Sequence, residues 1–520
     1  MRLASKQLRD LVQPHFRIQR VFISANPRNV EVFRAVAEHE SFRHRVQEIV
    51  WDDARLLRSL SEHVEENGYE PMHDEDFYEP SDDEEPPEKC PRDFWRACRE
   101  NIERAKERQG RDPKSLPEHV EFAEQRAAQL PYGVAHTYYQ KLLQQQSEVL
   151  ATEADRIAFD WVLDNDRFPN LRRITVTPVA HGMIFNPLYP TPMIREFPYG
   201  FNYPLPRSWP TPYKRSSIGA GDWATDADKD RYRGFCIVTR ALARQQRTKV
   251  PEFIIDGRQV NTGLTCEIFQ TAAEPSEEYE NLVSVIRKPG FTTLRLNLMV
   301  GGQDWQNWPA FRSGRLREAL NADLRHFTFE ADLNENMAWE SAGKPDHFVP
   351  LRSIFPVEAW TNLRHFGLSG FLVKQDDLLD LLRSLPSTLR SVELSFLEFM
   401  ENSGNYKGLL SSIRNDLGWR ERAIKPRVSI ALPSDSSLAG RAVWIDEEVE
   451  EYLYGDAENP YDRCEDRYLR CEDGRRLERG VGIERDAFEP RFERTWDWDP
   501  RKPDALPEGF VRGSQKRALR

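Results

Sequence analysis

The chain has 520 residues, with 85 acidic against 73 basic side chains, so its formal net charge is −12 when histidine is neutral. A surface of this sign repels phosphate and anionic lipid, so a nucleic-acid or membrane partner would require a locally basic face. The basic residues are interleaved with acids and build no such stripe, and we therefore expect neither partner. The hydrophobic fraction of 39% is low for a globular protein and predicts that part of the chain does not fold.

The cysteine pattern and the absence of long apolar runs predict a reduced compartment. Six cysteines, at positions 90, 98, 236, 266, 464 and 471, form no C-x-x-C pair, which disfavours thiol-rich metal sites and a disulfide scaffold. Residues 1–13 lack the apolar run of a signal peptide, and no stretch reaches the roughly 18 to 20 apolar residues that cross a bilayer. We expect a cytoplasmic or nuclear protein.

Residues 15–61 are predicted to form the first βαβ unit. The run 21–23 is a strand candidate, and Asn26 followed by Pro27 supplies a helix N-cap and a preorganised first helical residue. The apolar residues Val32, Phe33, Val36 and Ala37 then share one helical face, and residues 46–51 return as a second strand.

Two segments are predicted to be disordered. Residues 62–88 carry 13 acids, four prolines and neither Lys nor Arg, so the domain division assigns 62–91 to a disordered acidic segment. The tail 436–520 is also charged, with 21 acids and 16 bases in its last 80 residues. Within this tail, residues 444–455 could form one short element that docks on the body.

The remaining body, residues 92–435, alternates helical patterns with short strands. Residues 117–163 are mainly helical, and the last helix is expected to open on a capping-box-like start at Thr152 and to bury Ile157, Ala158, Trp161 and Val162. A Leu-Arg step followed by alternating apolar residues recurs at 171–172, 324–325, 363–364 and 389–390, with a looser copy at 294–295. This recurrence predicts an irregular leucine-rich-repeat-like α/β solenoid, and an ordinary α/β domain is the alternative.

Four stretches resemble a known family. Residues 1–12 (MRLASKQLRDLV) look like the last helix of an F-box, whose opening helices are not represented. Residues 20–56, 168–178 and 187–210 resemble large fungal F-box proteins with divergent leucine-rich repeats. The resemblance covers residues 1–435, and it implies that the F-box docks on the Skp adaptor of a cullin-RING ubiquitin ligase while the repeat domain selects a substrate protein.

The adaptor-binding residues implied by the resemblance are Ala4, Leu8, Leu11 and Val12, which follow helical spacing and form one apolar stripe. The same stripe could instead cover the open core of the first repeat. The expected partner-binding surface is the Pro/aromatic segment, defined here as residues 187–213, which contains eight prolines. Its aromatic surface either packs onto the body or presents a recognition face, and its partner-binding candidates are Tyr189, Phe197, Tyr199, Phe201, Tyr203 and Trp209.

The sequence offers no catalytic, cofactor-binding or metal-binding residues. It contains neither an H-E-x-x-H zinc helix nor a G-x-S-x-G nucleophile elbow. His326 and His365 occupy the same position after Leu-Arg, which indicates repeat structure rather than a metal site. We therefore expect a non-catalytic protein-recognition module, the substrate receptor of a Skp-cullin-F-box ligase. A repeat scaffold without any link to a ligase and an enzyme of unknown reaction are the alternatives.

Overall fold

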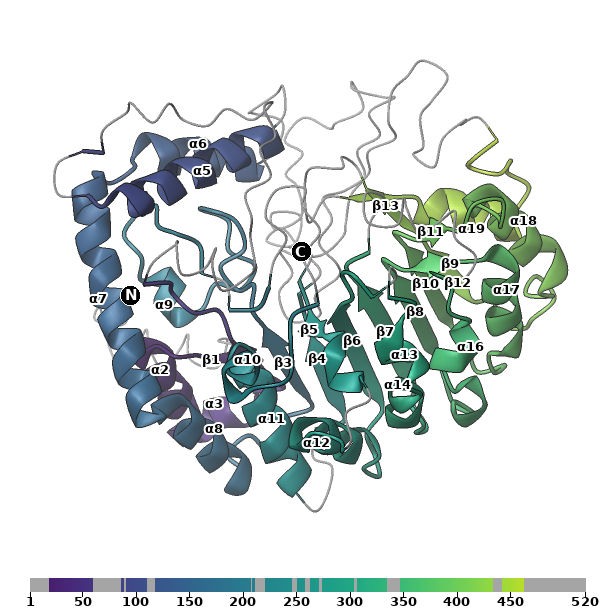
Figure 1. The fold of residues 1–520 in the computed structure, drawn as a ribbon, viewed down its shortest axis with the longest axis horizontal. Coiled ribbons are helices and arrows are strands. Elements are labelled where there is room, and N and C mark those ends of the chain that lie inside the picture. The colour runs from purple at the N-terminus through teal and green to yellow at the C-terminus, as the bar shows by residue number, and fades with distance from the viewer. Residues whose placement is uncertain are drawn as a thin grey trace.

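The structure is a computed structural model that describes residues 18–58, 86–87, 90–109, 117–206, 208–210, 220–245, 250–257, 262–270, 274–303, 306–333, 347–433 and 442–462. Its centre is one parallel β-sheet that carries helices along its outer side (Figure 1). At the β1 end of the sheet, the long helix α7 runs along the edge of the molecule from the helical pair α5 and α6 to α8 in the outer layer (Figure 1).

The sheet has ten strands, and nine of them follow the order β1-β2-β3-β4-β6-β7-β8-β10-β12, with β5 paired to β6. Within the described residues, all neighbouring strands of this sheet pair in parallel. Two small sheets accompany it, parallel β9-β11 and antiparallel β13-β14. The strands are β1 (Arg20–Ile23), β2 (Glu48–Asp52), β3 (Arg173–Thr177), β4 (Glu252–Ile255), β5 (Leu264–Thr265), β6 (Thr293–Met299), β7 (His326–Ala331), β8 (His365–Ser369), β9 (Leu372–Val373), β10 (Ser391–Ser395), β11 (Glu398–Phe399), β12 (Arg427–Ser429), β13 (Ala431–Pro433) and β14 (Ala442–Trp444).

The α-helices connect these strands or cover their ends. They are α2 (Pro27–Glu38), α3 (Glu40–Arg43), α5 (Arg92–Gln109), α6 (Pro117–Ala127), α7 (Tyr132–Thr152), α8 (Ala154–Asp164), α9 (Pro192–Arg195), α10 (Asp226–Asp230), α11 (Arg233–Arg244), α12 (Glu277–Ile286), α13 (Pro309–Arg312), α14 (Arg315–Ala319), α16 (Leu351–Ile354), α17 (Gln375–Ser384), α18 (Tyr406–Asp416) and α19 (Asp446–Tyr454).

Strand alternation divides the sheet into an apolar face and a polar face. In β7, Phe327 and Phe329 are fully buried in the core, and the ring of Phe329 contacts that of Phe311 in α13 at a centroid distance of 6.0 Å. The residues between them, such as Thr328, point to the opposite face, because successive side chains of a strand alternate. One face of the sheet therefore packs against the helices. The other carries polar side chains in β6 and β7, while at the β1–β2 end Phe22 and Val50 form a small apolar cluster with Ala180 and Tyr189.

Ion pairs between neighbouring strands compensate the charges on the polar face. Arg20 of β1 pairs with Glu48 of β2 at 2.5 Å, and Arg173 of β3 pairs with Glu252 of β4 at 2.7 Å. Between β6 and β7, Arg295 pairs with the buried Glu330 at 2.7 Å. Carboxylates buried to this degree require such partners, because an isolated buried charge is very costly.

The predicted irregular leucine-rich-repeat solenoid is wrong, because the strands form a single ten-stranded parallel sheet of an α/β fold. The connections between neighbouring strands share no common unit: four helices, α5 to α8, separate β2 from β3, whereas β9 and α17 separate β8 from β10. The Leu-Arg step recurs because several strands of one sheet begin in the same way. The alternative that the sequence left open, an α/β domain, is the correct class.

The first βαβ unit is present where the sequence predicts it. Strands β1 and β2 pair in parallel, and α2 begins at Pro27 after Asn26, whose side-chain oxygen accepts a hydrogen bond from the amide of Arg28 at 2.9 Å. Phe33 and Val36 are buried on the inner face of α2. The N-cap and the apolar spacing were sufficient to locate α2 in the sequence, because both signals act within a few residues.

The start of α8 differs from the prediction. Thr152 is the last residue of α7, and Glu153 forms a left-handed junction with φ 50° and makes no side-chain cap. Ala158 and Val162 are buried as predicted, but Ile157 is 47% exposed. The capping-box reading was therefore wrong, because two consecutive helices meet at the point where the sequence suggested the start of one.

The short element expected in the charged tail is present. Helix α19 packs beside α18, with Val449 and Leu453 buried in the core. Arg414 of α18 donates to the carbonyl of Tyr452 at 2.5 Å. The predicted disordered segments, 62–91 and the rest of the tail, lie mainly outside the described residues.

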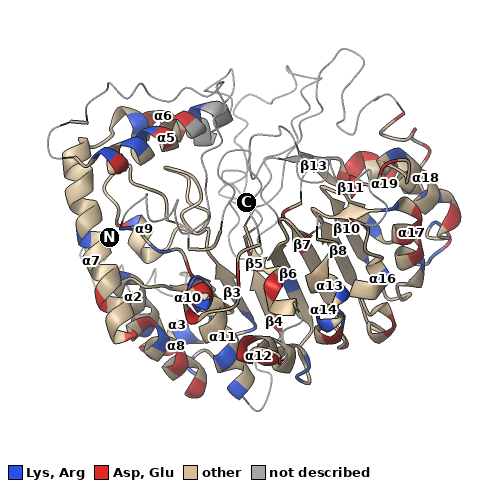
Figure 2. Ribbon diagram, viewed as in Figure 1, with Lys and Arg blue, Asp and Glu red and all other residues tan. Residues whose placement is uncertain are grey.

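Acidic and basic side chains are interspersed along the outer helices rather than segregated (Figure 2). The four cysteines within the described ranges, Cys90, Cys98, Cys236 and Cys266, are free thiols. Among the helices described above, none combines the length and the apolar character needed to cross a membrane.

Candidate functional site

The structure describes one of the two predicted sites. The adaptor-binding candidates Ala4, Leu8, Leu11 and Val12 fall outside the described residues. The Pro/aromatic segment is described at 187–206 and 208–210. Within these described residues the only helix is the single turn α9, and the remainder follows an irregular path between α7 and the sheet (Figure 1).

Most of the aromatic candidates in this segment are internal. Tyr189, Phe201, Tyr203 and Trp209 are all less than 9% exposed, and Phe197 is half-buried. Phe201 and Tyr203 belong to a second hydrophobic core with residues of α5 and α7. Tyr199 is the exception, because 56% of its surface is accessible. Of the six predicted partner-binding residues, Tyr199 therefore offers the largest exposed surface.

Hydrogen bonds at several points fix this segment to the body. The Tyr203 hydroxyl lies 2.7 Å from Nδ1 of His181, and the side chain of Asn202 donates to the Cys98 carbonyl at 2.8 Å. Gly200 has φ +74°, and a Cβ at this position would lie 2.2 Å from the Ala128 carbonyl oxygen. Only glycine fits this close approach, which brings the chain against α6 and leaves the neighbouring Tyr199 at the surface.

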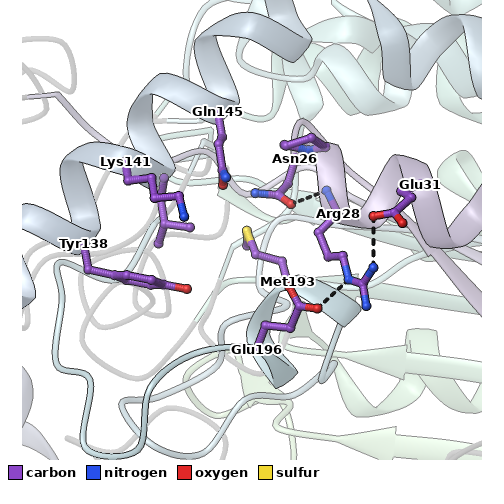
Figure 3. A pocket seen from close by; sticks show the side chains of 10 residues that line it. Asn26, Arg28, Glu31, Tyr138, Lys141, Gln145, Met193 and Glu196 are labelled. Atoms are coloured by element: carbon purple, nitrogen blue, oxygen red, sulfur yellow. Dashed lines mark hydrogen bonds and ion pairs between the residues drawn. The ribbon is translucent and has the colours of Figure 1, made fainter. Parts of the chain in front are cut away.

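A cavity of about 540 Å³ opens where this segment meets α7 and the N-terminus of α2 (Figure 3). Three parts of the chain that are distant in sequence supply its wall. The lining residues are Asn26, Pro27, Arg28 and Glu31 from the start of α2; Tyr138, Lys141, Leu142 and Gln145 from α7; and Met193 and Glu196 from α9 and its C-terminal end.

Asn29 holds two walls of this cavity together. Its side chain is fully buried, its amide donates to the Ser24 hydroxyl at 2.7 Å, and its oxygen accepts from the backbone N–H of Met193 at 2.9 Å. The first turn of α2 is thereby attached to the first turn of α9. The position of the Met193 side chain in the cavity follows from this one residue.

The charged groups around the cavity differ in whether they are compensated. Arg28 forms ion pairs with Glu31 at 2.9 Å and with Glu196 at 2.6 Å. The hydrogen bond with Glu31 is the main reason that the pKa of Arg28 is raised. Lys141 lies across the cavity on α7 and forms no ion pair with any residue in the described part of the chain (Figure 3). Its ammonium group is the one lining charge without a described counter-ion.

The remaining lining is amphipathic. Pro27, Leu142 and Met193 contribute apolar surface, while Tyr138 and Gln145 contribute a hydroxyl and an amide. Burial is the main cause that raises the pKa of Tyr138, and the nearby charge of Glu196 adds to it, so the hydroxyl stays protonated at neutral pH. The lining thus offers both apolar surface and hydrogen-bond donors.

Sequence reasoning did not find this cavity. The Asn26-Pro27 signal located the start of α2, and the Pro/aromatic pattern located the segment that carries Met193 and Glu196. Neither signal connects these residues to Lys141, because the contacts that bring them together are tertiary. The Pro/aromatic segment contributes Met193 and Glu196 to the lining, but none of its six predicted aromatic residues lines the cavity.

The two histidines that share a position in the sequence are neighbours in the sheet. His326 and His365 are register partners on β7 and β8, and Nδ1 of His365 lies 2.8 Å from the Ser391 hydroxyl on β10. Burial is the main cause that lowers the pKa of His365 to about 4, so this ring is neutral at physiological pH. Within the described ranges, no group of three or more His, Cys, Asp or Glu residues is placed to hold a metal ion.

No protein-family model, curated protein or solved structure matches this chain with significance.

Proposed function

We propose that this chain is a non-catalytic protein-recognition module that binds an extended segment of a partner protein in the cavity between α2, α7 and α9. The observation that carries the proposal is Lys141, which forms no ion pair within the described residues and lies across a cavity of about 540 Å³ from Met193 (Figure 3). This volume lies within the range of about 300 to 1,000 Å³ typical of ligand sites.

The charges of the lining limit what would occupy the cavity. Arg28 is already neutralised by two carboxylates, so Lys141 is left to attract an acceptor of the partner. A peptide would place an apolar side chain against Leu142 and Met193 and a carboxylate or backbone carbonyl toward the ammonium group. Charge-assisted hydrogen bonds of this kind are about twice as strong as neutral ones.

Tyr199 supports the same proposal. It belongs to the segment that forms one wall of the cavity, and it is exposed although the neighbouring rings are buried. Tyrosine is among the residues that contribute most to interface energy, because it buries a large ring and offers a hydroxyl. A partner segment that leaves the cavity toward the start of α7 would meet this ring.

The N-terminal resemblance suggests what the recognition serves. We propose that the chain is the substrate receptor of a Skp-cullin-F-box ligase, with Ala4, Leu8, Leu11 and Val12 contacting the Skp adaptor. A scaffold that binds proteins without a ligase is the alternative. Size-exclusion chromatography of the full-length chain with purified Skp adaptor separates them: co-elution supports the receptor, and separate elution leaves the scaffold.

The cavity itself is tested with a displayed library of random peptides selected on the full-length chain. We expect the selected peptides to bind the Lys141→Glu variant at least about tenfold more weakly than the wild type, because the substitution reverses the uncompensated charge. Gln140→Glu is the matched control, because it adds a negative charge to an exposed position of the same helix outside the lining. Peptides that bind both variants equally, or a selection that yields no binder, would reject the cavity as the recognition site.

A further inference from the structure

The Leu-Arg steps have a common structural position. Leu324, Leu363 and Leu389 are fully buried, and each following arginine is exposed and directly precedes a strand. Leu171 and Arg172 repeat the arrangement before β3. The looser copy differs, because Leu294 and Arg295 lie inside β6 and Arg295 pairs with Glu330.

Three of these arginines lie on adjacent strands, and we define Arg325, Arg364 and Arg390 as the arginine row. They precede β7, β8 and β10, which are neighbours in the sheet. The Arg364 amide donates to the Arg325 carbonyl at 2.7 Å, and the Arg390 amide donates to the Arg364 carbonyl at 2.7 Å. Because neighbouring strands are about 4.8 Å apart, the row spans about 10 Å.

The charges of the arginine row are not compensated within the described residues. The arginines on the polar face, by contrast, each have a carboxylate partner, as Arg20 has Glu48 and Arg173 has Glu252. Asp323, which precedes the first Leu-Arg step of the row, accepts instead from the side-chain amide of Asn362 at 2.7 Å.

His326, which directly follows Arg325, senses the charges of the arginine row. Burial is the main cause that lowers the pKa of His326; the negative charge of Glu252 opposes the shift, and the positive charges of Arg364 and Arg325 contribute to it. The starts of β7, β8 and β10 therefore carry three exposed arginines that form no ion pair within the described residues, on a chain whose net charge is −12.

We propose that the arginine row binds an acidic segment of a protein partner through the carboxylate or phosphate groups of its side chains. The guanidinium group presents a planar fork of donors that matches carboxylate and phosphate bidentately. The row is too short for a nucleic-acid surface, since such proteins typically contact about 6 to 10 phosphates. It lies toward the opposite end of the sheet from the β1 end that carries the cavity, so the inference goes beyond the proposed function and does not depend on it (Figure 1).

Fluorescence anisotropy with the full-length chain tests the arginine row. The probes are a labelled ten-residue peptide of alternating Glu and Ser, the same peptide with phosphoserine, a Gln-for-Glu peptide, and a single-stranded oligonucleotide of equal charge. We expect one of the two acidic peptides to bind, with the tighter of them identifying the recognised group, and the Gln peptide to bind at least about tenfold more weakly.

Two triple variants show whether binding belongs to the row. The variant that combines Arg325→Gln, Arg364→Gln and Arg390→Gln should bind the acidic peptide at least about tenfold more weakly than the wild type. The control combines Arg240→Gln, Arg244→Gln and Arg383→Gln, which remove the same charge from exposed helical arginines of the outer layer. Equal loss in both variants, no binding of either acidic peptide, or tighter binding of the oligonucleotide would overturn the proposal.

Discussion

Trp209 donates its indole N–H to Oδ2 of Asp53 over 2.8 Å, and both side chains are buried. The other carboxylate oxygen of Asp53 accepts from the backbone N–H of Gly234 at 2.9 Å, in the first turn of α11. Asp53 follows the last residue of β2. One carboxylate thus joins the central sheet, the Pro/aromatic segment and a helix of the outer layer.

Removing the indole donor should destabilise the protein while keeping a ring in place. We expect Trp209→Phe to lower the free energy of unfolding by about 1 to 3 kcal/mol, because a buried carboxylate oxygen loses its partner. Trp223→Phe is the matched control, since its N–H donates to the neutral hydroxyl of Ser276 at 3.2 Å and should cost about 0.5 to 1.5 kcal/mol. Urea unfolding measures both, and equal losses would contradict a special role for Asp53.

Asp53 should also make stability depend on pH. Burial raises its pKa from 3.8 to about 6, although Arg55 and the Trp209 hydrogen bond oppose the shift. Between these two values the native state holds the proton more tightly than the unfolded chain, so the stability contributed by this group falls as pH rises from about 4 to about 6. The difference is on the order of 3 kcal/mol.

Unfolding free energies of the wild type and Asp53→Asn across this pH window check the expectation. Asparagine does not titrate, so the variant should lack the part of the decline that Asp53 supplies. The comparison uses the slopes, because the substitution also changes hydrogen bonds and therefore the absolute stability. Parallel curves for the two proteins would assign the pH dependence to other groups.

The ion pair between Arg233 and Asp155 should contribute far more to the stability of the protein than the ion pairs on its surface. Arg233 contacts both carboxylate oxygens of the fully buried Asp155, at 2.6 and 2.9 Å. Arg233→Ala leaves that charge without its partner and should cost about 3 to 5 kcal/mol. In the same helix, Arg240 pairs with Glu277 at the surface, and Arg240→Ala should cost about 0 to 1 kcal/mol. Thermal or denaturant unfolding that ranks the two variants equally would refute this difference.

Gly234 is predicted to tolerate no side chain. A Cβ at this position would lie 2.3 Å from Cδ1 of Trp51 and 2.8 Å from Cγ of Asp53. Overpacking of this kind typically costs about 1 to 3 kcal/mol, and Gly234→Ala should also lengthen the Asp53 hydrogen bonds. At Gly302, by contrast, a Cβ would meet nothing within 4 Å, and only its φ of +80° would penalise Gly302→Ala, by about 1 kcal/mol. If unfolding experiments find Gly234→Ala no more destabilising than Gly302→Ala, the close packing described here is incorrect.

The sequence predicted the local elements better than their assembly. Asn26, Pro27 and the spacing of Phe33 and Val36 located α2, because capping and helical periodicity act within one or two turns. The Leu-Arg steps located the starts of four strands for a similar local reason. The repeat solenoid did not follow from them, because a motif that marks how a strand begins does not determine what connects it to the next strand.

The candidate site was predicted only in part. An excess of aromatic residues and prolines marked residues 187–213, but it did not say which rings face solvent, since that depends on the helices packed against them. Phe201 and Tyr203 are buried because α5 and α7 cover them, and Tyr199 is exposed because Gly200 brings the chain against Ala128. Lys141 carried no sequence signal at all.

The sequence by itself determined the α/β character, the first βαβ unit and the recurring Leu-Arg starts, because capping and strand alternation are local properties. Only the tertiary structure decided that the strands form one continuous parallel sheet, that three arginines align on it, and that a cavity opens beside Lys141. These features depend on contacts such as that between Asn29 and Met193, which are 164 residues apart. Such contacts arise from the packing of whole elements, and no local pattern records them.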